Sequence, residues 1–254
     1  MTEHWPEHGR RHSLRPRRHL KAEPLPVTKR LLTALVVAVA VAIIAPTAAR
    51  AAGGTLAVGM NLTIDNHACS LGFFATDSVE DQLAVTAGHC ANGFIEKVYD
   101  TFGDQIGEVV AWQPDAEDGR GKLTGSRGFT VIYTYKTFGI DAFFAGVGTA
   151  KVGDSVRLYG ARTSGTDGTI SKVSDSAGHP DLDLLTSDVV QLPGDSGGPW
   201  YSFGAPTLFG IASSGDEETG GGARGAQAQP LGSLEQEIKA VGRYGAGFSV
   251  YTKG

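Results

Sequence analysis

The pattern that most limits the fold of this chain is a series of short apolar or alternating runs separated by glycine, proline and aspartate. These runs have the length and the β-branched or aromatic content of β-strands. They are Leu71 to Ala75, Gln82 to Thr86, Ile106 to Trp112, Phe129 to Tyr135, Ala142 to Val147, Val156 to Tyr159, Thr169 to Val173, Leu182 to Leu185, Pro199 to Ser202 and Leu208 to Ala212. We therefore expect an all-β protein built on closed or sandwiched sheets.

Only one helical pattern interrupts this series. Leu231, Leu234, Ile238 and Val241 recur at intervals of three and four, and Gly242 ends the pattern. This predicts a C-terminal helix at about residues 231–242. The chain has 254 residues, of which 41% are hydrophobic, so it can bury a sizeable core.

The N-terminal segment has a different composition. Eight basic residues between positions 10 and 30 precede the apolar run 31–45, and the small-x-small pattern of residues 49–51 follows it. The apolar run is shorter than the ~20 residues that a membrane span needs. This order predicts that residues 1–51 are a secretory signal and 52–254 the exported domain. An uncleaved signal anchor is the alternative; after cleavage we expect no membrane contact.

Charge excludes one class of partner. Residues 1–51 contain 9 of the 22 basic and 3 of the 27 acidic residues, which leaves 13 basic and 24 acidic residues and a net charge of −11. Such a surface repels phosphate backbones, so we expect no nucleic-acid partner. We find no metal or cofactor motif and expect a monomer.

The two cysteines, Cys69 and Cys90, both follow the predicted signal. An oxidising compartment would allow them to form one bridge, which closes a loop of about twenty residues and contributes ~3 kcal/mol. Two buried thiols are the alternative. Two cysteines alone do not make a zinc site.

Ser196 lies in the sequence Gly194-Asp195-Ser196-Gly197-Gly198-Pro199. Glycines on both sides let the backbone turn sharply and present N–H groups beside the hydroxyl, which is what acyl transfer requires. A simple glycine-rich loop is the alternative.

His89 lies at the end of an apolar strand, in Thr86-Ala87-Gly88-His89-Cys90, and is one of three histidines after the signal, with His67 and His179. A histidine fixed at a strand end can act as a general base at neutral pH. A base of this kind also needs a carboxylate to hold its tautomer. We choose Asp141 because its apolar neighbours predict burial, whereas Asp104, Asp115 and Asp118 lie in polar, loop-like sequence. A turn or strand cap is the alternative role for Asp141.

The two motifs, in the order His, Asp, Ser, resemble the chymotrypsin-like serine peptidases, and the bacterial branch with α-lytic protease and the streptogrisins in particular. The resemblance extends from about Thr55 to the C-terminus. It implies two six-stranded antiparallel β-barrels, at about residues 55–148 and 149–230, followed by the helix. It also implies a secreted serine endopeptidase acting on peptides or proteins, with a catalytically silent binding module as the alternative.

The resemblance assigns further residues. It implies a bridge between Cys69 and Cys90, a pair between Arg162 and Asp195, and an oxyanion hole formed by the N–H groups of Gly194 and Ser196. The substrate-pairing edge would be Ser213, Ser214 and Gly215, and Ser213 would also support Asp141. Val190 stands where trypsin carries its pocket aspartate, so a preference for Arg or Lys is not expected.

Overall fold

The structure is a computed structural model that describes residues 53–117, 123, 125–214 and 225–253. The predicted signal, residues 1–51, therefore lies outside the described residues. Residues 49–254 form one compact unit. Within the described ranges, no helix has the length and apolar character needed to cross a membrane.

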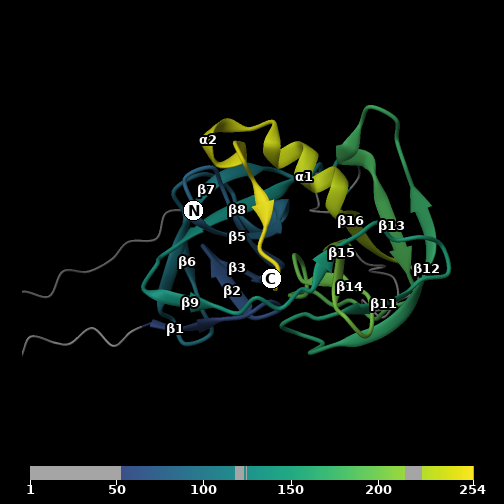
Figure 1. Ribbon diagram of the computed structural model, residues 1–254, viewed down its shortest axis with the longest axis horizontal. Coiled ribbons are helices and arrows are strands. Elements are labelled where there is room, and N and C mark those ends of the chain that lie inside the picture. Colours follow the sequence, from purple (N-terminus) through teal and green to yellow (C-terminus); the bar gives the residue numbers. More distant parts are fainter. Residues whose placement is uncertain (1–52, 118–122, 124, 215–224, 254) are drawn as a thin grey trace, which may run out of the picture. The chain divides into compact units, whose positions relative to one another are not determined.

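The first half of this unit forms an antiparallel sheet in the order β17-β4-β5-β8-β7-β6-β2-β3 (Figure 1). Its strands are β2 (Asn61–Ile64), β3 (His67–Ser70), β4 (Phe73–Thr76), β5 (Gln82–Ala87), β6 (Lys97–Tyr99), β7 (Gln105–Gln113), β8 (Phe129–Thr134) and β17 (Ser249–Val250). The paired strands do not close into the expected six-stranded barrel. In the pairings of the described residues, β17 and β3 stand at the two ends of the sheet, which is therefore a half-barrel.

The second half contains a closed six-stranded barrel, as the sequence predicts. The order is β15-β14-β11-β12-β13-β16, and pairing between β15 and β16 closes the ring. The strands are β11 (Ser155–Leu158), β12 (Thr166–Ser174), β13 (Leu184–Ser187), β14 (Pro199–Tyr201), β15 (Thr207–Ser214) and β16 (Ala226–Pro230). Strand β10 (Gly146–Val147) adds to β15 in parallel.

Several short strands were not anticipated from the sequence, because they are too brief or too polar to form a clear apolar run. They are β1 (Gly53–Leu56), β2, β3, β6, β9 (Phe138–Ile140), β16 and β17. Strand β1 pairs in parallel with β9 (Phe138–Ile140). The strand expected at Ala142 to Val147 is mostly wrong, since only Gly146 and Val147 are in a strand there.

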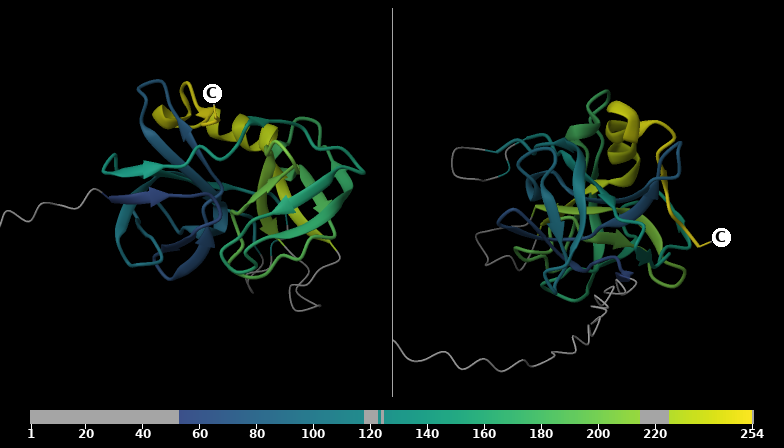
Figure 2. Two further views of the ribbon diagram at one scale, coloured as in Figure 1. Left: turned by 60° about the horizontal axis from the view of Figure 1, so that its bottom comes forward. Right: turned by 90° about the vertical axis from the view of Figure 1, so that its left-hand side faces the viewer.

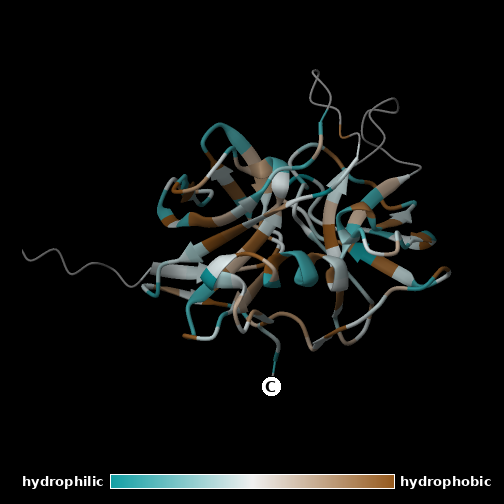
Figure 3. Cartoon of the chain, turned by 90° about the horizontal axis from the view of Figure 1, so that it is seen from above, coloured by the Kyte–Doolittle hydropathy of each residue, from teal (hydrophilic) through white to brown (hydrophobic). Residues whose placement is uncertain are grey.

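The buried apolar residues form two clusters. One includes Phe73 and Phe129 of the first sheet and extends to Leu208 and Ile211 of β15, and the other lies in the barrel and includes Trp200. Side chains alternate between buried and more accessible along β11 and β13, as expected for strands with one face toward a core. Figure 3 shows apolar segments along the strands of both halves.

The C-terminal helix is confirmed and ends slightly earlier than expected. Helix α1 (Leu231–Lys239) buries Leu234 and Ile238, and the short α2 (Gly242–Gly245) follows it. Helix α1 contacts β15 and β16 of the barrel, whereas α2 contacts β7 of the first sheet (Figure 2). The helices therefore lie against both halves.

Candidate active site

His89 lies in a short 3-10 turn (Gly88–Cys90) that follows β5. Both of its neighbours are fixed. Cys90 forms a disulfide with Cys69, which confirms the predicted bridge. The carbonyl of Gly88 accepts a hydrogen bond from Trp112 Nε1 at 2.9 Å. The backbone that carries the imidazole is thus held covalently on one side and by a strand side chain on the other.

The imidazole is oriented by Asp115, at 2.6 Å between His89 Nδ1 and Asp115 Oδ2. The Asp115 side chain is only 1% exposed, and its Oδ1 accepts the N–H of Gly128 at 2.6 Å. An ionised carboxylate can only accept hydrogen bonds, so Nδ1 carries the proton of the neutral ring. Nε2 is then left with a lone pair, which is the state that a general base requires.

Asp141 does not hold the imidazole, and this prediction is wrong. The residue is exposed, follows β9 directly, and donates its backbone N–H to Leu56 O at 3.0 Å. Its apolar neighbours predicted burial, but they lie in an irregular segment after a short edge strand. The carboxylate that contacts His89 comes instead from the loop between β7 and β8.

Two glycines make room for Asp115. A Cβ atom on Gly88 would lie 2.5 Å from Asp115 Oδ1, and one on Gly128 would lie 1.9 Å from the carbonyl oxygen of Gln113. Both distances are too short for real contacts, so the loop can close over His89 only because these positions lack side chains. The sequence held one indication of the role of Asp115: it follows the end of a predicted strand directly, in Trp112-Gln113-Pro114-Asp115.

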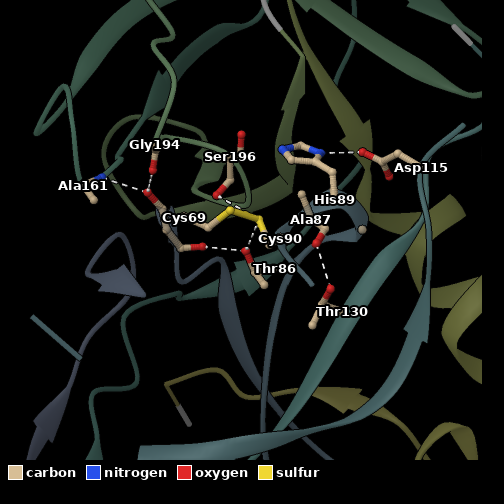
Figure 4. The surroundings of a disulfide bond; sticks show 12 residues. Cys69, Thr86, Ala87, His89, Cys90, Asp115, Thr130, Ala161, Gly194 and Ser196 are labelled. Carbon is tan, nitrogen blue, oxygen red and sulfur yellow. Dashed lines mark hydrogen bonds and ion pairs between the residues drawn. A yellow bond between two sulfur atoms is a disulfide. The ribbon is translucent and has the colours of Figure 1, made fainter. Parts of the chain in front are cut away.

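Ser196 is brought to the same place by its backbone. Its carbonyl oxygen accepts the N–H of Ser70 at 2.8 Å, and Ser70 follows Cys69, which is bonded to Cys90. Figure 4 shows Ser196 on the side of the imidazole opposite Asp115. The hydrogen bonds among the described residues do not include one between Ser196 and His89; such bonds are often long without substrate.

The turn before Ser196 leaves two backbone donors unused. The N–H groups of Asp195, Gly197 and Gly198 all donate hydrogen bonds, to Leu192 O, Ala212 O and Asp195 O respectively. Within the described part of the chain, the N–H groups of Gly194 and Ser196 donate none. Gly194 adopts φ +104°, and its carbonyl accepts a bond from Ser70 Oγ at 2.8 Å. This is the donor pattern that an oxyanion hole requires.

Asp195 is held differently from our expectation. The residue is fully buried, and its carboxylate accepts the backbone N–H groups of Arg162 at 2.9 Å, Thr163 at 3.0 Å and Leu192 at 2.8 Å. Among the ion pairs of the described residues, none joins Arg162 to Asp195, and the Arg162 side chain is exposed. The predicted contact exists, but a backbone amide makes it in place of the guanidinium.

The predicted substrate-binding residues that the structure describes lie at two places, after β13 and at the end of β15. Val190 follows β13 with 41% of its surface exposed. Ser214 ends β15 and pairs with Gln227 of β16. Ser213 is buried and its hydroxyl has no hydrogen-bond partner among the residues that the structure describes, so the support that we expected it to give the aspartate is not seen there. Gly215 lies outside the described residues.

Two buried ionisable groups near Asp115 were missed from the sequence. Glu237 of α1 accepts a bond from Gln229 Nε2 at 2.7 Å, and burial, together with the charges of Asp181 and Asp115, raises its pKa to about 7. Burial lowers the pKa of Arg127, while the charge of Asp115 raises it. Neither residue lies in a motif, so their burial could be found only in three dimensions.

No protein-family model and no curated protein sequence matches this chain. Solved structures do match. Protease A of Thermobifida fusca shares 21% sequence identity with a TM-score of 0.57, covering 78% of this chain and all of that one. The chymotrypsin of Cellulomonas bogoriensis shares 22%, with a TM-score of 0.54 and coverage of 78% and 100%.

An α-lytic protease homologue, N4, shares 25% sequence identity at a TM-score of 0.53, and the match covers 72% of this chain and 96% of that one. The chain therefore has the fold of the bacterial chymotrypsin-like serine proteases.

Proposed function

We propose that this protein is a serine endopeptidase in which Ser196, His89 and Asp115 act as nucleophile, base and orienting carboxylate. The observation that carries the proposal is the 2.6 Å contact between His89 Nδ1 and the buried Asp115 carboxylate, with Ser196 on the other side of the ring (Figure 4). A shared fold alone does not establish an activity, so the proposal rests on these residues.

The first half of the reaction follows from the tautomer that Asp115 imposes. Nε2 of His89 takes the hydroxyl proton as Ser196 Oγ attacks the carbonyl carbon of the scissile bond. The charge that develops on the carbonyl oxygen is stabilised by the unused N–H groups of Gly194 and Ser196. His89 then returns its proton to the leaving amine, which departs and leaves an acyl-enzyme.

In the second half, water takes the place of the amine. His89 removes a proton from the water, the new hydroxyl adds to the acyl carbon, and Ser196 leaves with the proton from His89. Throughout, Asp115 stays ionised and stabilises the transient imidazolium. Because the carboxylate is buried and bonded to Gly128 N, the imidazole cannot turn away between steps.

An extended peptide fits this site better than a small ester. The last residue of β15, Ser214, pairs with Gln227 on one side only, and the other side of its backbone has no strand partner within the described ranges. Such an edge can pair with a peptide backbone. We propose that Ser213, Ser214 and Gly215 bind substrate in this way and that Val190 disfavours Arg and Lys beside the scissile bond.

We further propose that the protein is exported and loses residues 1–51. Both the order of charge and apolar residues in that segment and the disulfide between Cys69 and Cys90 support export to an oxidising compartment. N-terminal sequencing of the protein recovered from culture medium tests this proposal.

Labelling with a serine-directed organophosphonate tests the activity. We expect stoichiometric labelling of the wild-type protein and loss of labelling in Ser196→Ala. Ser171→Ala is the control and should be labelled like the wild type, because it replaces an exposed serine of β12. An unlabelled wild-type protein would favour the catalytically silent binding module.

Cleavage of a diverse peptide library tests the specificity independently. We expect few products with Arg or Lys on the acyl side of the cut, because Val190 offers no charge to pair with them. A library cleaved mainly after Arg and Lys would contradict the role assigned to Val190 while leaving the peptidase activity intact.

A further inference from the structure

The described residues contain one buried cation among four buried carboxylates, and the mechanism above does not use it. Arg127 is 4% exposed, and the buried carboxylates are Asp77, Asp115, Asp195 and Glu237. A buried charge is costly unless it is well bonded or has a partner of opposite charge. Arg127 immediately precedes Gly128, whose N–H contacts Asp115, so this buried charge lies beside the candidate active site.

The guanidinium of Arg127 reaches the end of β15. Its Nη1 donates to the carbonyl of Gly125 at 2.5 Å, and its Nη2 donates to Ser214 Oγ at 3.1 Å and to Gln227 Oε1 at 3.4 Å. The hydroxyl of Ser214 in turn donates to Gln227 Oε1 at 2.7 Å. These contacts fix the side chain of the last described residue of β15 against β16.

The backbone N–H groups of Arg127 and Gly128 fix the loop that carries the candidate orienting carboxylate. The N–H of Gly128 donates to Asp115 Oδ1 at 2.6 Å, and the N–H of Arg127 donates to Asp181 O at 2.6 Å. Residues 127 and 128 therefore contact the orienting carboxylate through one group and the proposed substrate-pairing edge through another. The loop that carries them joins β7 and β8 of the first sheet, whereas Ser214 belongs to the barrel.

We propose that Arg127 is a positioning residue, whose guanidinium holds the substrate-pairing end of β15 in register with the loop that carries Asp115. The inference rests on the proposed peptidase function. The hydrogen bonds from Arg127 to Ser214 and Gln227 act on substrate binding, because they fix the end of the strand that the peptide would pair with.

Three variants test this role through KM measured separately from kcat. Arg127→Lys keeps the charge and loses the planar fork, so KM for a peptide substrate should rise about tenfold while kcat changes much less. Arg127→Met removes all the hydrogen bonds of the guanidinium, so KM should rise at least as much. Ser214→Ala removes one partner of the guanidinium and should also raise KM.

Arg157→Met is the matched control, because it removes an arginine of β11 whose side chain is largely exposed and pairs with Asp167 at 2.5 Å, and neither KM nor kcat should change. Organophosphonate titration normalises each rate to competent sites and reports the proposed function separately, since wild-type protein that is not labelled overturns that function.

In labelled protein, an unchanged KM in both Arg127→Lys and Ser214→Ala overturns the positioning role. If Arg127→Met does not fold, Arg127→Gln replaces it in the KM measurement.

Discussion

The two sides of the candidate active site are built by different means. On the first sheet, His89 is held by side chains: the disulfide of Cys90, the carboxylate of Asp115 and the indole of Trp112. On the barrel, Ser196 is held by its backbone and by the lack of side chains at its neighbours. We therefore expect the function of His89 to suffer when the side-chain groups that hold it are removed. We expect the function of Ser196 to suffer when side-chain atoms are added to the glycines beside it.

The largest expected effect tests the base side. Asp115→Asn keeps the shape but can donate to Nδ1, which favours the wrong tautomer of His89, so kcat should fall about 10⁴-fold. Asp141→Asn is the control, and its exposed side chain predicts no change. Both are measured as kcat on one peptide with the active sites titrated. Equal activities of the two variants would contradict the assignment of Asp115.

The next effect tests the nucleophile side. A methyl group on Gly197, at φ +83°, would lie 1.9 Å from Thr86 Oγ1 and 2.6 Å from Ser70 O. Gly197→Ala should therefore lower the free energy of unfolding by at least about 3 kcal/mol, with loss of activity. Gly204 has a similar φ of +80° but open space around it.

Gly204→Ala is thus the matched control and should cost only about 1–2 kcal/mol for the left-handed backbone, with activity retained. Urea unfolding measures both variants. If the two substitutions lower the free energy of unfolding by the same amount, close packing around Gly197 is not what constrains the turn.

A third test removes the covalent link between β3 and the turn that carries His89, both on the first sheet. Replacing Cys69 and Cys90 together by serine should lower the free energy of unfolding by about 3 kcal/mol, because the unfolded chain gains the freedom of a loop closed over 21 residues. Thermal unfolding in oxidising and reducing buffer measures the effect. The wild-type protein should be sensitive to reductant and the double variant should not; equal sensitivity would contradict a structural bridge.

The smallest effect concerns Glu237, which lies behind the base. Its pKa is about 7 in the folded protein and 4.5 in the reference state, so folding disfavours the ionised form. This cost is absent below pH 4.5, develops between pH 4.5 and 7, and is complete above pH 7. Wild-type stability should fall over that window, and Glu237→Gln should remove the slope, with a gain of roughly 1–3 kcal/mol above pH 7.

Glu235→Gln on the same helix is the control, since Glu235 forms a partly exposed pair with Lys239 at 2.5 Å. Its effect should stay below about 1 kcal/mol at every pH. Urea midpoints measured from pH 4 to 8 compare the two variants, and parallel curves for Glu237→Gln and wild type would exclude Glu237 as the titrating group.

Predictions from the sequence succeeded where the signal was local. Strands β5, β7 and β8 have continuous apolar runs and were placed within one or two residues. Strand β16 alternates alanine with glutamine and was missed, because its burial comes from pairing with β13 and β15 and not from its own hydrophobicity. The open first sheet was also unexpected, since closure depends on how β3 meets its neighbours.

The sequence by itself determined the nucleophile and base motifs and the pair of cysteines, because each depends on residues that are adjacent or unique in the chain. Only the tertiary structure decided which carboxylate meets His89 and what holds Asp195. Asp115 lies in polar sequence and is buried only because Gly88 and Gly128 let its loop approach. Asp195 is held by backbone amides, which every residue has, so the identity of Arg162 could not reveal the contact.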